Sequence, residues 1–447
     1  MTKGKKTFLQ TNLKKINTLW TVLGTLLHTF RVHFIESKKP QPSWDFKMHV
    51  IFSLIKNFIV RGAKETVEDA QILVSRVKPK SYKDIAIRTL VIPQEYRERA
   101  AKKFEEAYPE ILLEHESKAG PLTAEWITFT GKQSDSSKKP VIMLYLHGGA
   151  YYLGSADSHR DLVAGLVKRT GGEALVINYR LAPQDAFPYA IHDSLASYLY
   201  LLDSCSREGS RIAPENIAVL GDSAGGGLTM ASLLAIRKTG LVAPACAVGI
   251  SPWVDLTHSM NSVQSNRDTD YLPGGGLQNH AMSPLTSDKR WVGRKHYYAP
   301  NSSLAHPLVS PLFEADLRGL PPLLIQLGDG ELLRDEGILF SLRASGNYQA
   351  MNLNEETQNS TPTPVALEIY GEMPHVFHVF SFTTGAKIAL DRCAKFVKQV
   401  IQEKETPLVP TAQTNYLTEN FIDYHGNIKS VKKTEVVGDG KTIIMSY

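Results

Sequence analysis

The chain has 447 residues, 43% of them hydrophobic and 21% charged, with 32 glycines and 24 prolines. This composition is typical of a globular protein and excludes a collagen-like, coiled-coil or largely disordered chain. The formal net charge of +5 is small and dispersed, so it does not predict a nucleic-acid partner. Three widely spaced cysteines form neither a metal-binding pair nor a disulfide framework, and we expect them to be buried thiols: Cys205, Cys246 and Cys393.

An apolar segment near the N-terminus bears on the location of the protein. From Ile16 to Phe30, large apolar side chains recur at helical spacing, polar uncharged residues occupy the opposite face, and no charged residue intervenes. The segment is shorter than the roughly 20 residues that span a bilayer, but Lys15 and Arg31 could snorkel at its ends. We therefore expect residues 1–35 to form a membrane anchor. Two amphipathic helices packed on the body, the second at 50–60, are the alternative.

Charge around this segment predicts an orientation. Five lysines precede the segment, which favours a cytosolic N-terminus and, if the segment spans, places the rest of the chain in the lumen of the endoplasmic reticulum. Two glycosylation sequons, at Asn301 and Asn359, fall in predicted loops and are compatible with that side. The alternative is a cytosolic, membrane-associated protein whose first helix lies in the membrane interface.

Beyond Ile111, predicted strands alternate with predicted helices, a pattern that indicates an α/β fold with a mostly parallel central sheet flanked by helices. The strands are continuous apolar runs, as expected where both faces are buried. They lie at 141–146, 174–178, 217–220, 247–250, 323–327 and 366–370, with helices at 161–169, 190–202, 226–238 and 385–402. We expect a helical cap at 36–115, an α/β domain at 116–403 with an irregular lid insertion at about 257–310, and a C-terminal tail at 404–447.

A candidate nucleophile stands between one of these strands and the helix that follows it. Residues Gly221 to Gly225 read G-D-S-A-G, which fits the G-x-S-x-G pattern of a strained turn that exposes a serine at a helix N-terminus. Because both the strand and the helix occupy the required places, we interpret Ser223 as a nucleophile. A plain glycine-rich turn is the alternative.

A second motif, His147-Gly148-Gly149-Ala150, directly follows the strand at 141–146. Acyl transfer needs N–H donors aimed at a developing oxyanion, and adjacent glycines let backbone N–H groups approach closely. We predict that the N–H groups of Gly148, Gly149 and Ala224 form an oxyanion hole.

With these motifs in order, the chain resembles the hormone-sensitive-lipase-like group of α/β-hydrolases, with arylacetamide deacetylase and the fungal steryl acetyl hydrolases as the most similar types. The resemblance extends from about Lys139 to Gln402 and implies an α/β-hydrolase fold. Ala150 departs from the family pattern where a third glycine is usual, and Gln184 replaces a common glutamate. The resemblance rests on the motifs HGGAYYLGS, NYRLAPQDAFPYAIHD, GDSAGGG, SPWVDL, GDGELLRDE and GEMPHVF.

The resemblance also implies the remaining catalytic residues, which follow the serine in the order acid and then histidine. The acid aligns with Glu331, the first residue of E-L-L-R-D, while Asp329 is an alternative that a small loop shift could present. The base aligns with His375 in a loop after the last predicted strand, and nearby His378 is expected to pack on the following helix. No metal or organic cofactor is expected.

The resemblance implies a serine carboxylesterase that removes a short acyl group, such as acetyl, from a small lipophilic ester of a sterol or another apolar alcohol. The triad and the backbone oxyanion hole would carry out this hydrolysis. An arylacetamide-type amide deacetylase or a general lipid esterase is the alternative. A non-catalytic ligand-binding protein of the same fold is disfavoured, because a serine, an acid and a histidine are all present.

Overall fold

The structure is a computed structural model. It describes residues 20–62, 65–75, 80–112, 117–131, 139–205, 209, 211–273, 283, 285–287, 289–348, 360–403, 416–437 and 440–446.

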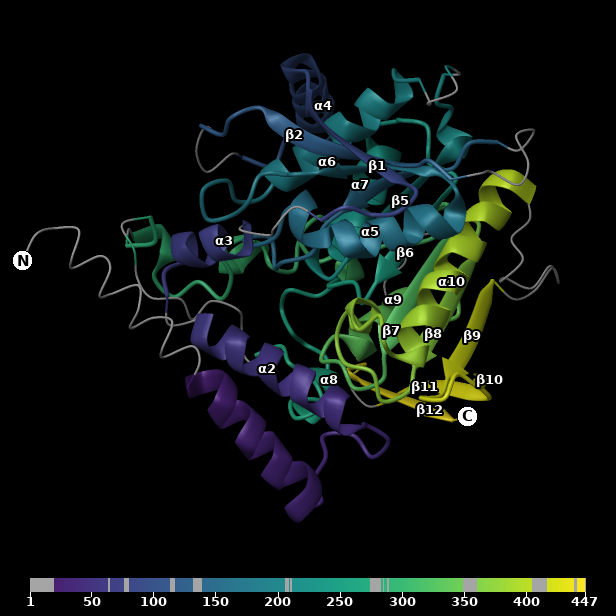
Figure 1. The fold of residues 1–447 in the computed structure, drawn as a ribbon. Coiled ribbons are helices and arrows are strands. Elements are labelled where there is room, and N and C mark those ends of the chain that lie inside the picture. The colour runs from purple at the N-terminus through teal and green to yellow at the C-terminus, as the bar shows by residue number, and fades with distance from the viewer. Residues whose placement is uncertain are drawn as a thin grey trace, which may run out of the picture.

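A ten-stranded sheet runs through the molecule in the order β1-β2-β4-β3-β5-β6-β7-β8-β9-β10 (Figure 1). The strands from β4 to β9 are parallel, while β1, β2 and β10 run antiparallel to their neighbours. Every residue of the six central strands is buried, which explains their continuous apolar runs. These strands are β3 (Ile142–Leu146), β4 (Glu173–Ile177), β5 (Ile217–Asp222), β6 (Cys246–Ile250), β7 (Leu323–Gly328) and β8 (Val365–Tyr370).

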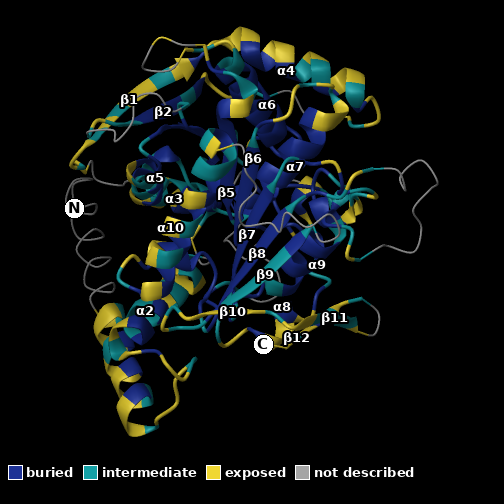
Figure 2. Ribbon diagram, turned by 90° about the vertical axis from the view of Figure 1, so that its right-hand side faces the viewer, coloured by how far each residue is buried: buried dark blue, intermediate teal, exposed yellow. Residues whose placement is uncertain are grey.

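Helices cover both faces of this sheet, and Figure 2 shows the buried strands between them. One apolar cluster contains side chains of α6 (Tyr189–Leu202), α7 (Ala224–Lys238) and α9 (Arg334–Ala344). A second cluster, on the other face, contains side chains of α5 (Ala156–Thr170) and α10 (Thr384–Lys398). This arrangement confirms the predicted α/β class. Of the three cysteines, Cys246 and Cys393 are buried, but Cys205 is exposed, so the prediction was wrong for that thiol.

The first two strands correct one part of the predicted organisation. β1 (Ile85–Ile92) lies inside the segment expected to be a purely helical cap, yet it pairs along its whole length with β2 (Leu122–Phe129). An edge strand is covered less than a central one, and the exposure of β1 is accordingly mixed although its sequence, IAIRTLVI, is largely apolar. The helix α4 (Gln94–Ala107) connects the two strands and packs on α6.

The C-terminal segment continues the same sheet. β9 (Leu417–Ile422) pairs in parallel with β8, and β10 (Ile428–Ser430) closes that edge. A separate hairpin of β11 (Lys433–Val437) and β12 (Thr442–Ser446) follows, and β12 contacts α9.

The N-terminal helices lie on one side of the body (Figure 1). Residues 20–30 are α-helical and continue into η1 (Arg31–Ile35), and α2 (Phe46–Gly62) and α3 (Val67–Ser75) follow. Among the described residues, no helix combines the length and apolar character that crossing a membrane requires. Residues 1–19, where the expected anchor begins, lie outside the described part of the chain.

Short helices complete the fold. The insertion at 257–310 contains α8 (Ser262–Ser265), η3 (Lys289–Trp291) and η4 (Asn301–Ser303). Asn301 is exposed, whereas Asn359, the other predicted sequon, lies outside the described residues. The remaining turns are η2 (Pro214–Asn216), η5 (Pro311–Phe313), η7 (Phe377–Val379) and η8 (Gln399–Glu403).

Candidate active site

Ser223 occupies a sharp turn between β5 and α7. Its φ of 53° is positive, a conformation that non-glycine residues rarely adopt and that marks a strained position. The flanking glycines are required by space, because a Cβ at Gly221 would stand 2.2 Å from the Gly225 carbonyl oxygen and one at Gly225 would stand 2.0 Å from the Leu146 oxygen. The turn therefore presents the Ser223 hydroxyl at the N-terminus of α7, as the motif predicted.

A chain of hydrogen bonds joins three side chains from separate loops. The Ser223 Oγ lies 2.9 Å from His375 Nε2, and His375 Nδ1 lies 3.0 Å from Glu331 Oε2. These loops follow β5, β7 and β8, so the carboxyl ends of parallel strands bring the residues together. The His378 side chain is elsewhere, with its Nε2 2.9 Å from Gln326 Oε1.

Burial and charge set the properties of the His375–Glu331 pair. Glu331 is fully buried, and its Oε1 accepts a hydrogen bond of 3.1 Å from the Gly328 N–H. Burial raises the pKa of Glu331, against the lowering effect of His375. Burial alone would lower the pKa of His375, but the hydrogen bond and charge of Glu331 outweigh it and raise that pKa above its ordinary value. The pair therefore favours an imidazolium once a proton arrives.

The rival acid, Asp329, points to a different partner. Its Oδ1 accepts a hydrogen bond of 3.2 Å from the Arg334 guanidinium, and no hydrogen bond joins it to His375. Of the two acids considered from sequence, the structure brings Glu331 to the histidine.

The insertion supplies a residue that the sequence analysis missed. Asp270 is fully buried, and its carboxylate accepts hydrogen bonds from the N–H groups of Tyr271, at 2.7 Å, and Leu332, at 2.6 Å. The hydroxyl of Tyr271 donates to the His375 carbonyl oxygen at 2.5 Å. Asp270 and its neighbour thus hold both the acid loop and the histidine loop in place. Their segment has no periodic pattern that could have singled them out.

The glycine-rich loop after β3 differs from prediction in one residue. The Gly148 N–H donates to Asp222 Oδ1 at 3.0 Å, so it is already engaged and does not face an acyl group. This corrects the choice of Gly148 as an oxyanion donor. Gly149 and Ala150 line the cavity beside Ser223, and their N–H groups have no hydrogen-bond acceptor among the described residues. Ala150 has a φ of 54°, which accounts for the family's usual glycine at this position.

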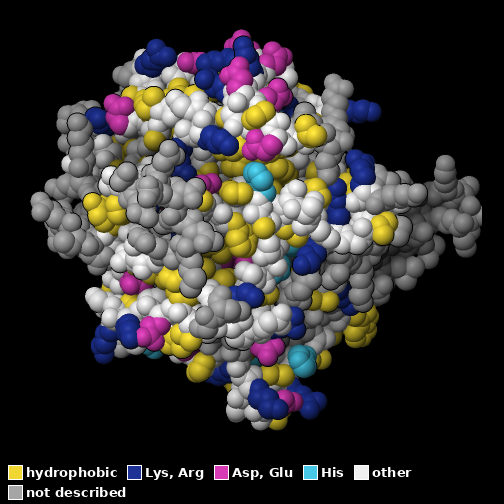
Figure 3. All heavy atoms as spheres, turned by 180° about the vertical axis from the view of Figure 1, so that it is seen from behind, with side chains coloured by type: hydrophobic (Ala, Val, Ile, Leu, Met, Phe, Trp, Pro, Cys, Tyr) yellow, Lys and Arg dark blue, Asp and Glu magenta, His cyan; other side chains and the backbone are white. Residues whose placement is uncertain are grey.

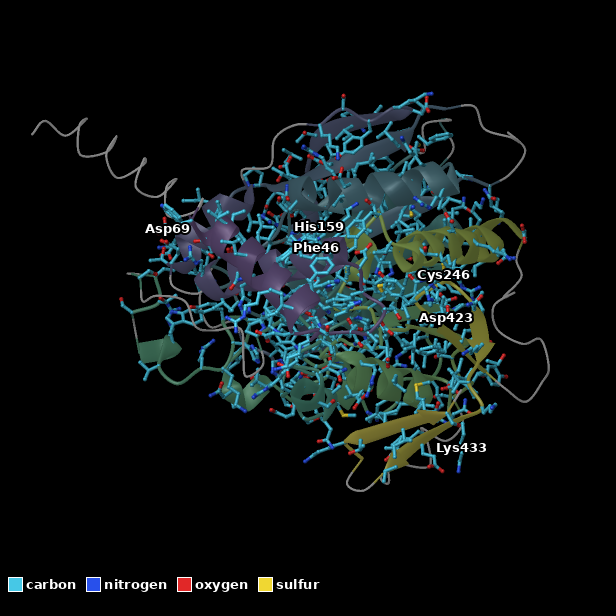
Figure 4. All side chains as sticks on the ribbon, turned by 60° about the horizontal axis from the view of Figure 1, so that its bottom comes forward. Phe46, Asp69, His159, Cys246, Asp423 and Lys433 are labelled. Atoms are coloured by element: carbon cyan, nitrogen blue, oxygen red, sulfur yellow. The ribbon has the colours of Figure 1, made fainter. Side chains whose placement is uncertain are left out.

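Asp222 is the anchor of this loop. Besides Gly148, it accepts a hydrogen bond of 2.7 Å from the Tyr145 hydroxyl, and its Oδ2 lies 3.4 Å from His159 Nε2. Burial acts to raise the pKa of Asp222, but the charge and hydrogen bonds of His159 and Tyr145 lower it to about 2. Asp222 raises the pKa of His159 in turn, against the lowering effect of burial. His159, labelled in Figure 4, therefore pairs with a carboxylate directly beside the nucleophile.

An apolar cavity of about 280 Å³ opens beside Ser223 and His375. Its walls come from the loops after the strands, from the insertion and from α2, which contributes Ile59. In the described part of the chain, no group of three or more His, Cys, Asp or Glu side chains is arranged to hold a metal ion. Apolar side chains of the lining include Trp253, Leu153, Leu272, Leu332, Leu333 and Val379.

Comparison with known proteins identifies the family. Residues 143–379 match a protein family described as having the alpha/beta hydrolase fold. An acetyl-hydrolase of Streptomyces hygroscopicus is 36% identical over 259 residues, which cover 58% of this chain and 73% of that protein. An esterase of Acinetobacter venetianus is 34% identical over 203 residues, covering 45% and 61% of the two chains.

Solved structures give the same result. The crystal structure of an esterase from the bacterial hormone-sensitive lipase family superposes with a TM-score of 0.58 at 28% identity, covering 78% of this chain and 98% of that one. An esterase/lipase from an uncultured bacterium has a TM-score of 0.58, also at 28% identity, covering 78% and 97%. These similarities confirm the predicted fold.

Proposed function

Since the chain belongs to the hormone-sensitive-lipase-like α/β-hydrolases and is an ester-hydrolysing enzyme, we propose that Ser223, His375 and Glu331 form its catalytic triad and that its substrates are short-acyl esters of lipophilic alcohols. The observation that carries the proposal is the hydrogen-bonded chain from Ser223 Oγ through His375 to Glu331 at the wall of an apolar cavity.

The first chemical step is acylation. His375 Nε2 takes the proton of the Ser223 hydroxyl as its oxygen attacks the ester carbonyl carbon, and the Glu331 carboxylate stabilises the imidazolium that forms. His375 then gives this proton to the departing alcohol. In the second step, the same nitrogen takes a proton from water as that water attacks the acyl carbon, and it then gives this proton to the Ser223 oxygen as the acid leaves.

The tetrahedral intermediates carry negative charge on the former carbonyl oxygen. The N–H of Ala224, the first residue of α7, is free of the helix ladder and adjoins the nucleophile. Together with the N–H groups of Gly149 and Ala150 it supplies three backbone donors, and the N-terminus of α7 adds a favourable dipole. Removing one donor of such a group typically lowers turnover by roughly 100- to 1,000-fold.

The cavity supports the proposed substrate class. At about 280 Å³ it lies near the lower end of pockets for small molecules, which suits a short acyl group better than a long fatty acyl chain. Its apolar walls suit a lipophilic alcohol such as a sterol, whose bulk would extend toward the side of the cavity that α2 forms.

A chain-length series tests this proposal. Purified full-length protein is assayed with p-nitrophenyl esters from acetate to laurate and with a sterol acetate, with Ser223→Ala as the inactive control. We expect the highest kcat/KM for the acetate to butyrate range and release of acetate from the sterol ester. A preference for laurate would contradict the short-acyl assignment, and hydrolysis of a matched acetanilide at a comparable rate would make the protein an amide deacetylase.

A further inference from the structure

The outermost helix of the molecule, residues 20–35, exposes most of its large apolar side chains. Figures 1 and 2 show it on the outer side of α2, with much of its surface exposed. Trp20 is 67% exposed, Leu27 is 63% exposed and Ile35 is 71% exposed. Four further large apolar side chains of this helix are exposed as well: Val22, Leu23, Phe30 and Phe34.

The inner face of the same helix is polar. Thr25, Thr29 and His33 recur every four residues and are all buried against α2. Asn57 Nδ2 of α2 donates to Thr25 Oγ1 at 3.0 Å, and His33 Nδ1 lies 3.1 Å from His49 Nδ1. The two helices therefore meet along a seam of polar contacts, beside which Phe30 and Phe34 pack on the Phe46 ring of α2, with ring centroids 6.0 and 5.1 Å away.

This polarity is the reverse of that found in a water-exposed helix, and α4 of the same protein provides the contrast. α4 buries Tyr96, Ala100 and Phe104 and exposes charged residues. The upper part of Figure 3 shows basic and acidic side chains intermingled on the surface at that end of the molecule. The outer helix buries polar groups and exposes apolar ones, so its orientation suits an apolar surrounding.

We propose that residues 20–35 lie in the surface of a lipid bilayer, with the face that contains Trp20, Leu27 and Phe34 immersed among the acyl chains. Polar groups within lipid must find their partners inside the protein, and α2 provides one for Thr25 and one for His33, whereas the buried Thr29 hydroxyl has no hydrogen-bond partner among the described residues. No Asp or Glu occurs from 20 to 35. At the end of the helix, Arg31 and Lys38 both pair with Glu36, at 2.9 and 3.9 Å, but their side chains stay 70% and 78% exposed, where they can also meet anionic headgroups.

The same placement brings the cavity to the lipid, an extension that rests on the proposed function. Ile59 of α2 lines the cavity, while its neighbours Phe58 and Val60 are 55% and 52% exposed. Val379, from the turn after His375, also lines the cavity and is 52% exposed. A lipophilic ester dissolved in the bilayer would thus reach Ser223 along an apolar path beside α2.

Vesicle flotation tests the lipid contact without using activity. Purified full-length protein is mixed with phosphatidylcholine vesicles, with and without phosphatidylserine. We expect it to float with both, and more strongly with the anionic lipid. The double variant Leu27→Gln/Phe34→Gln should lower the bound fraction by roughly tenfold or more, because apolar burial drives interfacial binding. The matched control, Val242→Gln, changes a residue that is 64% exposed on another element and should bind like the wild type.

Tryptophan fluorescence gives a second readout at one residue. Trp20 is exposed, whereas Trp44, Trp126, Trp253 and Trp291 are buried, with at most 7% of their surface accessible. Vesicles with bromine atoms on the acyl chains should therefore quench the wild type and leave Trp20→Phe nearly unquenched.

Two results would overturn the proposal. One is a protein that neither floats nor is quenched, and the other is a protein whose apolar face is covered by a second copy, seen as a dimer in light scattering that Leu27→Gln/Phe34→Gln dissociates. Hydrolysis of p-nitrophenyl butyrate without vesicles is measured in parallel. Full activity with no lipid binding would reject the lipid contact alone, and lipid binding without activity would reject the proposed function alone.

Discussion

Two regions on the two sides of the cavity differ in which side chains they bury and which they expose. Around Ser223, loops of the central sheet bury Glu331, Asp222 and Asp270 because backbone N–H groups and side chains satisfy each carboxylate. On the α2 side, helix 20–35 also buries polar groups, but most of its large apolar side chains face outward, whereas α2 itself buries Met48 and Phe52. Buried polar groups therefore have two roles in this protein. In the core they hold the side chains around Ser223 in place, and in helix 20–35 they face α2, which leaves an apolar surface exposed.

The largest expected effect is the loss of activity in Ser223→Ala, which should leave the N-terminal helices unchanged. Ser223→Ala removes the hydroxyl and should lower kcat by roughly a million-fold, as is typical for a triad serine. Labelling of the protein by a fluorophosphonate should vanish, while vesicle flotation should be unchanged. Labelling that persists would assign the nucleophile to another residue.

Substitution of the proposed triad acid, Glu331, should have the second largest effect on kcat. Glu331→Gln leaves His375 without its charge partner and should lower kcat on the order of 10⁴-fold. Asp329→Asn is the matched control and should cost little, since Asp329 pairs with Arg334 at the surface of the loop. Reversed effects in a steady-state assay would make Asp329 the triad acid.

Asp222 tests whether the glycine loop depends on a buried charge. Asp222→Asn keeps an oxygen that can accept from Gly148 but removes the charge beside His159, and we expect kcat to fall roughly 10- to 100-fold with little change in KM. Steady-state kinetics measure this split. A larger KM with unchanged kcat would show that Asp222 supports substrate binding and does not position the oxyanion donors.

The pH dependence of the wild type reports on the histidine. His375 must be neutral to accept the serine proton, and Glu331 raises its pKa above the ordinary value of about 6.5. We therefore expect kcat/KM to fall on the acid side with an apparent pKa above 6.5. In Glu331→Gln this limb should move to lower pH, because the largest effect that opposes burial is then lost and only the charges of Asp270 and Asp222 still raise the pKa of His375.

The smallest expected effect is the pH dependence of the contact between helix 20–35 and α2. Burial, together with neighbouring cations, lowers the pKa of His33 and lowers that of His49 to about 4. Free histidines titrate near 6.5, so the packed helices exclude protons that the separated helices would bind. The contact is thus fully stable above about pH 6.5 and weakens as the pH falls toward 4.

Hydrogen exchange measures this effect by segment. Corrected for intrinsic rates, amides of 20–35 should lose protection between about pH 7 and pH 5, while those of β5 keep theirs. Equal protection at both pH values would show that the histidine pair does not hold the seam.

Much of the core could be predicted because its signals are local. Strands buried on both faces appear as continuous apolar runs, and the turn around Ser223 needs glycines at fixed spacing. β1 was not predicted because it precedes the alternation of strands and helices that begins after Ile111, although its own sequence, IAIRTLVI, is largely apolar. The hydrogen bond of the Gly148 N–H was not predicted for another reason. It depends on where the Asp222 side chain points, and Asp222 is 74 residues away in the sequence.

The N-terminal helix shows a different limit. Its periodicity predicted an apolar and a polar face, of which the structure exposes Leu27 and buries Thr25 and Thr29, but the side that turns toward the protein depends on α2 and not on the helix itself. Asp270 is a similar case, since its role follows from three loops that meet only in the folded chain.

The strands contributed by residues 416–437 have a consequence for handling the protein. β8, which leads into the His375 loop, gains a hydrogen-bonded neighbour in β9, and the sheet then ends at β10, a strand of three exposed residues. Such a short border gives another chain little backbone to pair with. Shortening the chain before Leu417 would uncover six residues of β8 as an open edge, so we expect that truncation to cause aggregation as well as to loosen the histidine loop.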